Sequence, residues 1–441
     1  MSQVAERHET YLAEHDRFVK GRGSVGSAWL RELRERGAAR FAELGFPTVR
    51  QEEWRFTNVA PIVDTAFRLA DKAPVNAEEN VARVAIPNAA ARIVILNGHF
   101  SPELSELNNL PAGARVGSLA EAIASGAPEV AHLGQMPWEQ APFVALNTAF
   151  LEDGAIVVIP PRAVLDGPIH IISLNGGEGK TMAHPRTLIV MGSGSEAKVA
   201  QTFLGVAGEA HFTNPVTEVV VGDGAVLDLY TDQRETDLAY HVASVYARIE
   251  RSATFRTRTI SLGGKLLRND TIALLDGEGA HATLDGVYLV DGDRLIDNHT
   301  TIDHATPNCT SHELYKGILD GKARAVFNGR IIVRLDAQKT DSKQTNRALL
   351  LSDDAQVNSN PQLEIFADDV KCTHGAAIGQ LDEEAMFYLQ ARGLTPRDAR
   401  DLLIHAYAGE VLEGIGIEHL KNQLLRELFM QLERDLADHE Q

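Results

Sequence analysis

Short apolar runs separated by polar turns dominate the middle of the chain. Runs such as ARIVILNG, GAIVVIP, TLIVMG and TEVVVG follow one another from about residue 90 to about residue 370, with Gly, Asp, Asn and Pro between them. Their length and their β-branched residues are typical of β-strands. The pattern therefore predicts a mainly β core over residues 91–380.

These runs recur at a regular interval. Four segments that end at Ala197, Ala225, Ala253 and Ala280 each open a strand, and the alanines are 28, 28 and 27 residues apart. A fixed period with a tight turn followed by strands is typical of stacked coils. We therefore predict a right-handed parallel β-helix in which each repeat forms one coil of two or three strands of about five residues. The alternative is a β-sandwich, a more abundant fold that does not require a regular period.

The N-terminal part of the chain follows a helical period instead. Apolar residues recur three or four positions apart until Gly45 and Pro47, where the period stops. The residues on this stripe are Trp29, Leu30, Leu33, Ala38 and Phe41. We therefore expect a small helical or mixed domain over residues 1–90.

Residues 381–441 also have a helical period. Thr395 and Pro396 form an N-cap and a first helical position, and two amphipathic helices follow. Their apolar stripes comprise Ala399, Leu402, Leu403, Ala406, Tyr407 and Val411, and then Ile417, Leu420, Leu424, Leu428 and Leu432. The predicted C-terminal helical domain has 6 basic and 13 acidic residues, a net charge of 6 − 13 = −7. Such a surface fits either a docking site for a partner or a solvated face.

Charge and composition exclude several classes of function. The 441 residues include 42 basic and 61 acidic side chains, and the net charge of −19 argues against a nucleic-acid-binding protein. We find neither an N-terminal signal sequence nor an apolar run of 18 residues, so we expect a cytoplasmic protein that is not in a membrane. With only two cysteines, a disulfide framework is excluded.

Two glycine-rich stretches resemble nucleotide-binding motifs but do not fit them. Gly192–Ala197 formally matches a dinucleotide fingerprint, yet too few residues follow for a crossover helix. Gly179–Thr181 ends like a phosphate loop, but Leu174 stands where the first glycine is required. We interpret Asn175–Gly177 as a hairpin turn between two strands. The sequence therefore does not predict an ATPase.

The thiol and imidazole side chains offer more specific chemistry. Cys372 and His374 are two residues apart, so on a strand they would present both donors on the same face. Both are donors for borderline and soft metals, which makes them candidate metal ligands. Cys309 and His312 form a second pair, and for Cys309 we favour a buried or half-buried thiol over a ligand.

Two stretches near the C-terminus form a long and specific pattern. They are DDVKCTHGA at Asp368–Ala376 and FYLQARG at Phe387–Gly393, followed by a helix with an A-x-x-L-L pattern. Supporting stretches are Glu53–Thr57, Leu146–Thr148, Tyr315–Ile318, Phe327–Gly329 and Asp336–Gln338. In these features the chain resembles the SufB/SufD family of iron-sulfur cluster assembly proteins over essentially its whole length. Gly375 after the histidine favours the SufD branch, whereas SufB typically continues His-Glu-Ala; the SufB branch is the alternative.

The resemblance implies a non-catalytic scaffold subunit of a SufBCD complex. It implies pairing with a SufB-type subunit through the β-helix, or a homodimer in isolation, and docking of a SufC-type ATPase on the C-terminal helical domain. It also implies a role for His374 at the shared interface, with Cys372 beside it, where an iron-sulfur cluster is present transiently in the complex and no cofactor is bound stably by this subunit alone. The residues expected to dock the ATPase are Phe387, Tyr388, Leu389, Arg392 and Gly393.

Two alternatives belong to other classes of function. A β-helix alone is compatible with an enzyme that acts on polysaccharides, although neither convergent carboxylates nor an export signal is visible. A zinc protein would use Cys309, His312, Cys372 and His374, provided that the two pairs meet in space.

Overall fold

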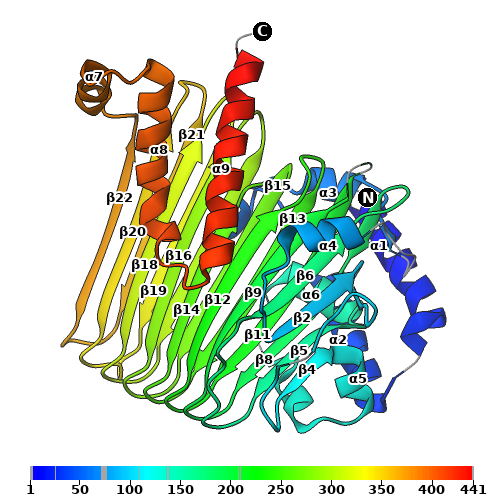
Figure 1. Ribbon diagram of the computed structural model, residues 1–441. Coiled ribbons are helices and arrows are strands. Elements are labelled where there is room, and N and C mark those ends of the chain that lie inside the picture. Colours follow the sequence, from blue (N-terminus) through cyan, green and yellow to red (C-terminus); the bar gives the residue numbers. More distant parts are fainter. Residues whose placement is uncertain are drawn as a thin grey trace.

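A parallel β-helix forms the body of the protein in the computed structural model (Figure 1). The structure describes residues 3–24, 26–70, 77–107, 109–135, 137–138, 140–206, 208 and 210–439. Two long sheets face each other, and the chain alternates between them as it winds from coil to coil. Because neighbouring strands within each sheet are nearly all parallel, the mainly β, parallel β-helix prediction is confirmed.

One sheet, which we call the N-sheet, carries the N-terminal segment on its outer face. Its main path is β4 (Arg115–Ser118), β5 (Gly154–Ile159), β8 (Arg186–Met191), β11 (Val216–Val221), β13 (Tyr240–Ile249), β15 (Leu266–Leu275), β17 (Leu295–His304), β19 (Arg324–Val333) and β21 (Gln356–Ile365). Three short strands extend it: β1 (Arg68–Leu69), β7 (Thr181–Ala183) and β10 (His211–Thr213).

The other sheet, which we call the C-sheet, carries the C-terminal helices. In spatial order it contains β3 (His99–Phe100), β2 (Ala91–Leu96), β6 (Ile169–Asn175), β9 (Glu196–Gly205), β12 (Val226–Arg234), β14 (Thr254–Ser261), β16 (His281–Val290), β18 (Thr310–Leu319), β20 (Asp341–Leu350) and β22 (Lys371–Gly379). Most coils therefore contain two strands of eight to ten residues, so the prediction of strands of about five residues is wrong.

The coil register explains the alanine repeat. The residues just before β12, β14 and β16 are Ala225, Ala253 and Ala280, and all three are fully buried in the core between the sheets. Cys309 holds the same position before β18, where it is also fully buried, which confirms the expectation of a buried thiol. Ala197 does not share this position, because it pairs with Leu227 and not with Ala225. The coil from β9 to β12 is therefore 30 residues long, two more than the spacing of the alanines suggested.

Helices cover the outer faces of both sheets. Against the N-sheet lie α1 (Gln3–Lys20), α2 (Ala28–Leu44), α3 (Ala60–Asp64) and α6 (Pro142–Ala149), with α5 (Leu119–Ala124) beside β5 and α4 (Glu78–Val84) near β2. Short 3-10 helices occur at Arg22–Ser24, Glu52–Trp54 and Pro128–His132. Against the C-sheet lie α8 (Pro396–Leu412) and α9 (Glu418–His439), whereas α7 (Glu383–Ala391) projects from the last coil (Figure 1).

The predicted terminal helices are largely confirmed. The helix α2 ends at Gly45, as the sequence pattern indicates, and Ser27 caps its first turn. In α9 the whole predicted stripe from Leu420 to Leu432 is buried. On α8 the predicted stripe is partly wrong, because Leu402 and Ala406 are exposed, whereas Ile404 and Ala408 are buried. The division into domains at residues 90 and 380 stays a prediction, and residues 1–2, 25, 71–76 and 440–441 of the two terminal domains lie outside the described residues.

The turn at Asn175–Gly177 differs from its prediction. It connects β6 to β7, but β6 pairs with β2 and β9, whereas β7 pairs with β1 and β10. The turn therefore carries the chain from one sheet to the other and does not form a hairpin. Gly192–Gly194 lies in the tight turn between β8 and β9, which agrees with the rejection of a dinucleotide site.

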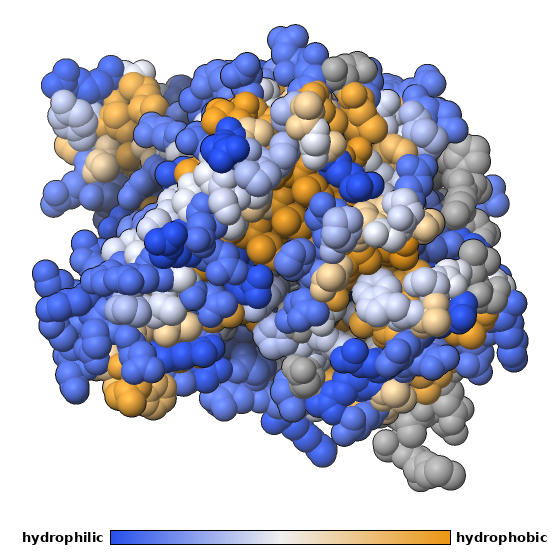
Figure 2. Space-filling view, turned by 90° about the horizontal axis from the view of Figure 1, so that it is seen from below, coloured by the Kyte–Doolittle hydropathy of each residue, from blue (hydrophilic) through white to orange (hydrophobic). Residues whose placement is uncertain are grey.

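The face of the molecule drawn in Figure 2 is predominantly hydrophilic. Hydrophobic residues form several groups on this face, one of them in a hollow near the centre of the view. None of the helices in the described part of the chain combines the length and the apolar character that crossing a bilayer would need.

Candidate functional site

The last coil of the β-helix ends in two strands that each lack a partner on one side. In the described ranges, β22 pairs only with β20, and β21 pairs only with β19. An unpaired strand presents a row of backbone donors and acceptors that can pair with another chain. We call this end of the β-helix, formed by β21 and β22, the open end.

Cys372 and His374 lie on the inner face of β22 at the open end. Their register partners on β20 are Ser342 and Gln344, both of which are buried between the two sheets. His374 is exposed, whereas Cys372 is half-buried against the end of the apolar core. The prediction that both side chains share one face therefore agrees with the strand geometry, and the register identifies that face as the inner one.

Burial makes the Cys372 thiol less acidic. Partial burial raises its pKa, the nearby Asp341 carboxylate raises it further, and a backbone hydrogen bond at Ser342 opposes both effects. The thiol form is therefore favoured in this chain by itself. A change at the open end that removed Asp341 or brought a cation close would increase the thiolate fraction.

A polar row lies behind Cys372. The Ser342 hydroxyl lies 2.7 Å from the hydroxyl of Ser311, and the Ser311 hydroxyl lies 2.9 Å from Nε2 of His304. Burial lowers the pKa of His304 to about 4, with Asp303 acting in the opposite direction. His304 is therefore a neutral imidazole, and this row contributes hydrogen bonds rather than charge.

A second polar row lies behind His374. Gln344 follows on β20 and Glu313 on β18, and the Gln344 side-chain amide donates to Oε2 of Glu313 at 2.7 Å. Gln344 has room because Gly329 faces it from the N-sheet, where a Cβ would overlap the Gln344 amide nitrogen. Sequence reasoning missed both Glu313 and Gln344, although Gly329 belongs to one of the family-like stretches.

Bulky rings in the same coils interlock with glycines. The Tyr315 ring occupies the space in front of Gly286, and the Tyr288 ring occupies the space in front of Gly317. A Cβ on either glycine would overlap the facing ring. The stretch Tyr315–Ile318 therefore owes its glycine to packing inside the β-helix.

The residues expected to dock a partner lie on α7 and just after it. Phe387 and Tyr388 are 75% and 57% exposed, and the Arg392 guanidinium donates to the Tyr388 hydroxyl at 2.9 Å and stacks on its ring. Leu389 is half-buried, and Gly393 has a φ of +96°, which favours glycine where the chain turns into α8. A groove lined by Leu349, Ile378, Leu403 and Tyr407 runs between β22 and α8. Together these residues form an exposed apolar surface, which we call the α7 surface.

Charged contacts tie α8 to the outer face of β18. Lys316 donates to the carbonyl oxygen of Tyr407 at 2.9 Å and forms an ion pair with Glu410. Arg400 of α8 pairs with Asp320 at 2.9 Å. The strand that α8 contacts through Lys316 carries Glu313 on its other face. A displacement of α8 would therefore act directly on a strand that lines the interior.

The stretch Glu53–Thr57 binds the outer face of the N-sheet. The Trp54 ring stacks on the guanidinium of Arg268, which lies 3.7 Å from the ring centre. Arg268 also donates to the Glu53 carbonyl oxygen at 2.7 Å, and the Thr57 hydroxyl donates to Asp297 at 2.6 Å. Arg268 and Asp297 are buried and form an ion pair at 2.7 Å.

His299 completes this charged cluster. It lies between Asp297 at 2.9 Å and the Glu53 carboxylate at 3.3 Å, at the edge of a cleft of about 550 Å³ that Trp54 and Phe143 also line. Burial is the largest influence and would lower its pKa, but the charge of Asp297 and the hydrogen bonds to Asp297 and Glu53 together outweigh it and raise the pKa to about 9. His299 is therefore a cation at neutral pH, and the cluster fixes the N-terminal segment to the neighbouring strands β15 and β17.

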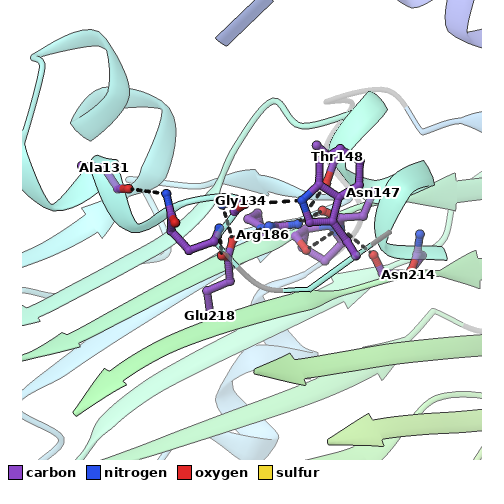
Figure 3. A network of polar contacts seen from close by, with 10 residues as sticks. Ala131, Gly134, Asn147, Thr148, Arg186, Asn214 and Glu218 are labelled. Carbon is purple, nitrogen blue, oxygen red and sulfur yellow. Dashed lines mark hydrogen bonds and ion pairs between the residues drawn. The ribbon is translucent and has the colours of Figure 1, made fainter. Parts of the chain in front are cut away.

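A buried ion pair performs the same task nearer the N-terminal end of the β-helix (Figure 3). Arg186 on β8 pairs with Glu218 on β11, and Glu218 accepts hydrogen bonds from the backbone of Gly134 and Gln135. Arg186 also donates to Asn147 on α6 at 3.0 Å. The family-like stretch Leu146–Thr148 thus connects α6 to two coils through one buried network.

A zinc site is not supported by this arrangement. Cys309 is fully buried in the core, whereas His312 points to the outer face of β18 towards Asp285. Within the described ranges, no three His, Cys, Asp or Glu side chains gather as a metal site would require. Cys372 and His374 supply two donors to the open end, so a metal held there would need further ligands from elsewhere.

Comparison with known proteins identifies the family. The model of the SUF system FeS cluster assembly SufBD core domain matches residues 172–407, and that of the SufBD protein N-terminal region matches residues 6–171. The chain belongs to the SufB/SufD family of iron-sulfur cluster assembly proteins. The SufB/SufD core thus begins within β6 and extends into α8, so it includes the open end.

Relatives of this SufB/SufD protein match it over nearly its full length. A SufBD family iron-sulfur cluster assembly protein of Synechocystis is 33% identical over 433 residues, covering 95% of both chains. The iron-sulfur cluster assembly protein SufD of Escherichia coli is 31% identical over 88% of this chain and 90% of its own. SufD of Bacillus subtilis is 24% identical over 90% and 93%. This chain is therefore a homologue of proteins named SufD, as the sequence resemblance indicated.

Proposed function

We propose that this SufB/SufD-family chain is a non-catalytic scaffold subunit of a SUF complex. The observation that carries the proposal is the position of Cys372 and His374 on the inner face of an edge strand at the open end. The sulfur of Cys372 is a soft metal ligand and the imidazole of His374 is a borderline one. At the open end they are suited to hold an intermediate between two subunits. The iron-sulfur cluster is then a cargo that is present transiently in the complex, and no cofactor is bound stably by this subunit alone.

The open end supports pairing with a SufB-type subunit. The strands β21 and β22 each have an edge without a partner strand in the described ranges, so a second β-helix of the same family would continue both sheets. His374, which is exposed here, would become enclosed at such an interface. A homodimer through the same edges is the alternative in isolation.

The α7 surface supports docking of a SufC-type ATPase. Two of its aromatic residues, Phe387 and Tyr388, have most of their side-chain surface exposed, and aromatic side chains together with arginine are typical of binding hot spots. Movement of the docked ATPase would act through α8 and Lys316 on β18. We therefore propose that nucleotide-driven motion of the ATPase opens the subunit interface to iron and sulfur, in the cytoplasm.

Co-purification tests this proposal. The full chain and a chain that ends at residue 380 are each co-expressed with SufB-type and SufC-type candidates. We expect the full chain to retain both partners and the shortened chain to retain only the SufB-type subunit. Retention of the ATPase by the shortened chain would contradict the docking site.

A second experiment tests the open end. His374→Ala is expected to leave the complex intact but to abolish maturation of iron-sulfur enzymes in cells that depend on this chain. Thr373→Ala is the matched control, because Thr373 is an exposed neighbour on the opposite face of β22. Normal enzyme maturation with His374→Ala would remove the open end from the function.

A further inference from the structure

Glu313 is a buried carboxyl group that the proposed scaffold role does not use. It is fully inaccessible on the inner face of β18 and accepts one hydrogen bond, from Gln344. Its other oxygen, Oε1, is buried and has no hydrogen-bond partner in the described part of the chain. A carboxylate needs several donors or a cation to remain ionised in such surroundings, so these surroundings favour the neutral acid.

The surroundings of Glu313 bring its pKa close to neutral pH. Burial raises its pKa to about 7, while the nearby Thr300 hydroxyl and the Gln344 amide act in the opposite direction. Asp285 raises this pKa and His312 lowers it, both from the outer face of the C-sheet. Glu313 is therefore able to gain or lose a proton at the pH of a cell.

Three other titratable groups near Glu313 in the same interior remain neutral: Tyr288, Tyr315 and His304. Burial raises the pKa of Tyr315, two residues further along β18, far above the physiological range. His304, on β17, is neutral because burial lowers its pKa to about 4. By contrast, Glu235 is equally buried, but His241 and His211 outweigh the effect of burial and keep its pKa below the ordinary value. Glu313 differs from Glu235 because it lacks such partners.

Glu313 is connected to the open end by a row of polar groups. Its register partner Gln344 is followed by His374, and successive strands lie about 4.8 Å apart, so two strand spacings separate Glu313 from His374. The buried oxygen atoms Oε1 of Gln344, Oδ1 of Asn346 and Oγ1 of Thr300 have no partner within the described ranges. Buried polar groups of this kind recruit internal water, which transfers protons.

We propose that Glu313 accepts the proton that is released when sulfur binds iron at the open end. The inference rests on the proposed function, because it needs cluster chemistry beside His374. In this step a thiol or hydrosulfide loses its S–H bond and forms an Fe–S bond with ferrous iron, without a change in oxidation state. The proton passes through internal water to the Glu313 carboxylate and later leaves to solvent by the same row.

Infrared spectroscopy of the full chain tests the proton-holding group without any cluster chemistry. The C=O stretching band of a protonated carboxyl group is followed as a function of pH. We expect a band that disappears with a midpoint near pH 7 and that is lost in Glu313→Gln, but kept in Glu278→Gln, which changes an exposed carboxyl group. Should the Gln variant not fold, Glu313→Asp must shift the midpoint. An unchanged titration in these variants would overturn the proposal.

Cluster assembly by the complete complex tests the role of that proton. Glu313→Gln is expected to slow assembly about tenfold or more and to remove the dependence of the rate on pH near 7. If His374→Ala abolishes assembly while Glu313→Gln keeps the wild-type pH profile, Glu313 is not the proton acceptor and the proposed function stands. If His374→Ala assembles clusters normally, the proposed site itself is wrong, whatever the infrared result.

Discussion

The guanidinium of Arg268 lies flat against Trp54, 3.7 Å from the centre of the indole ring. Arg268 belongs to β15, deep in the β-helix, whereas Trp54 belongs to the N-terminal segment. Because this cation–π contact is buried and is accompanied by the ion pair to Asp297, it joins two parts of the chain that are more than two hundred residues apart.

We expect Trp54→Ala to destabilise the protein by about 3–5 kcal/mol, since the side chain is 7% exposed and its loss leaves a cavity and an unstacked arginine. The midpoint of urea unfolding, followed by circular dichroism, measures the effect. Trp29→Ala is the matched control, because Trp29 is 40% exposed and its loss should change stability by less than about 0.5 kcal/mol. Equal effects of the two substitutions would contradict the role of Trp54 in fixing the N-terminal segment to the β-helix.

Stability should fall between pH 7 and pH 10 because of His299. Burial would lower the pKa of this histidine, but the charge of Asp297 and the hydrogen bonds to Asp297 and Glu53 together raise it to about 9, above the value of about 6.5 in an unfolded chain. A raised folded-state pKa stabilises the protein fully below the unfolded value, and that stabilisation is lost as the pH rises through about 9.

The His299 effect is measured as the free energy of unfolding against pH for the wild type and for His299→Gln. The wild type should lose a few kcal/mol over this window, because each unit of pKa shift corresponds to about 1.4 kcal/mol. The variant should be less stable at pH 7 and nearly flat up to pH 10. A wild-type curve that is flat over the same window would show that His299 is not held as a cation.

Gly317→Ala should destabilise the protein by about 1–3 kcal/mol, since a Cβ at this position would overlap the Tyr288 ring in a closely packed interior. Tyr288→Leu in the same chain should recover part of the loss, so a double-mutant cycle gives a coupling energy. Gly379→Ala, on β22, is the control, because a Cβ there has no neighbour within 4 Å. Additive effects of the substitutions at Gly317 and Tyr288 would argue against direct packing of the Tyr288 ring on Gly317.

The repeat could be predicted from the sequence because its period is a property of one position in each coil. Small residues such as Ala225 and Ala253 must stack at the same turn, and that requirement is visible as a spacing. The turn at Asn175–Gly177 was misassigned for the complementary reason: local turn residues do not reveal which sheet the next strand joins. That choice depends on pairing with strands far away in the sequence.

The candidate site shows the same limit. The spacing of Cys372 and His374 was sufficient to place them on one face of a strand, but not to identify the inner face. Glu313 and Gln344 could not be connected to His374, because they lie about 30 residues apart in sequence and meet only once the coil register is known. Gly329 was the available signal, as a glycine within a strand often marks a close approach by another group.

Substitutions on the α7 surface should weaken partner binding without lowering the stability of the protein. Because Phe387 and Tyr388 are exposed, the double substitution Phe387→Ala/Tyr388→Ala should leave the free energy of unfolding within about 0.5 kcal/mol of the wild type. Truncation of an aromatic hot-spot residue to alanine typically weakens binding by about 2 kcal/mol or more. The affinity for a SufC-type ATPase should therefore fall about thirtyfold or more.

Calorimetric titration of the full chain with the ATPase measures this affinity. Leu238→Ala is the control, because Leu238 is 52% exposed but lies in the turn between β12 and β13, away from α7. Wild-type affinity in the double variant would place the ATPase elsewhere on the chain. A loss of affinity in the Leu238 variant as well would mean that binding depends on general surface apolarity rather than on the α7 surface.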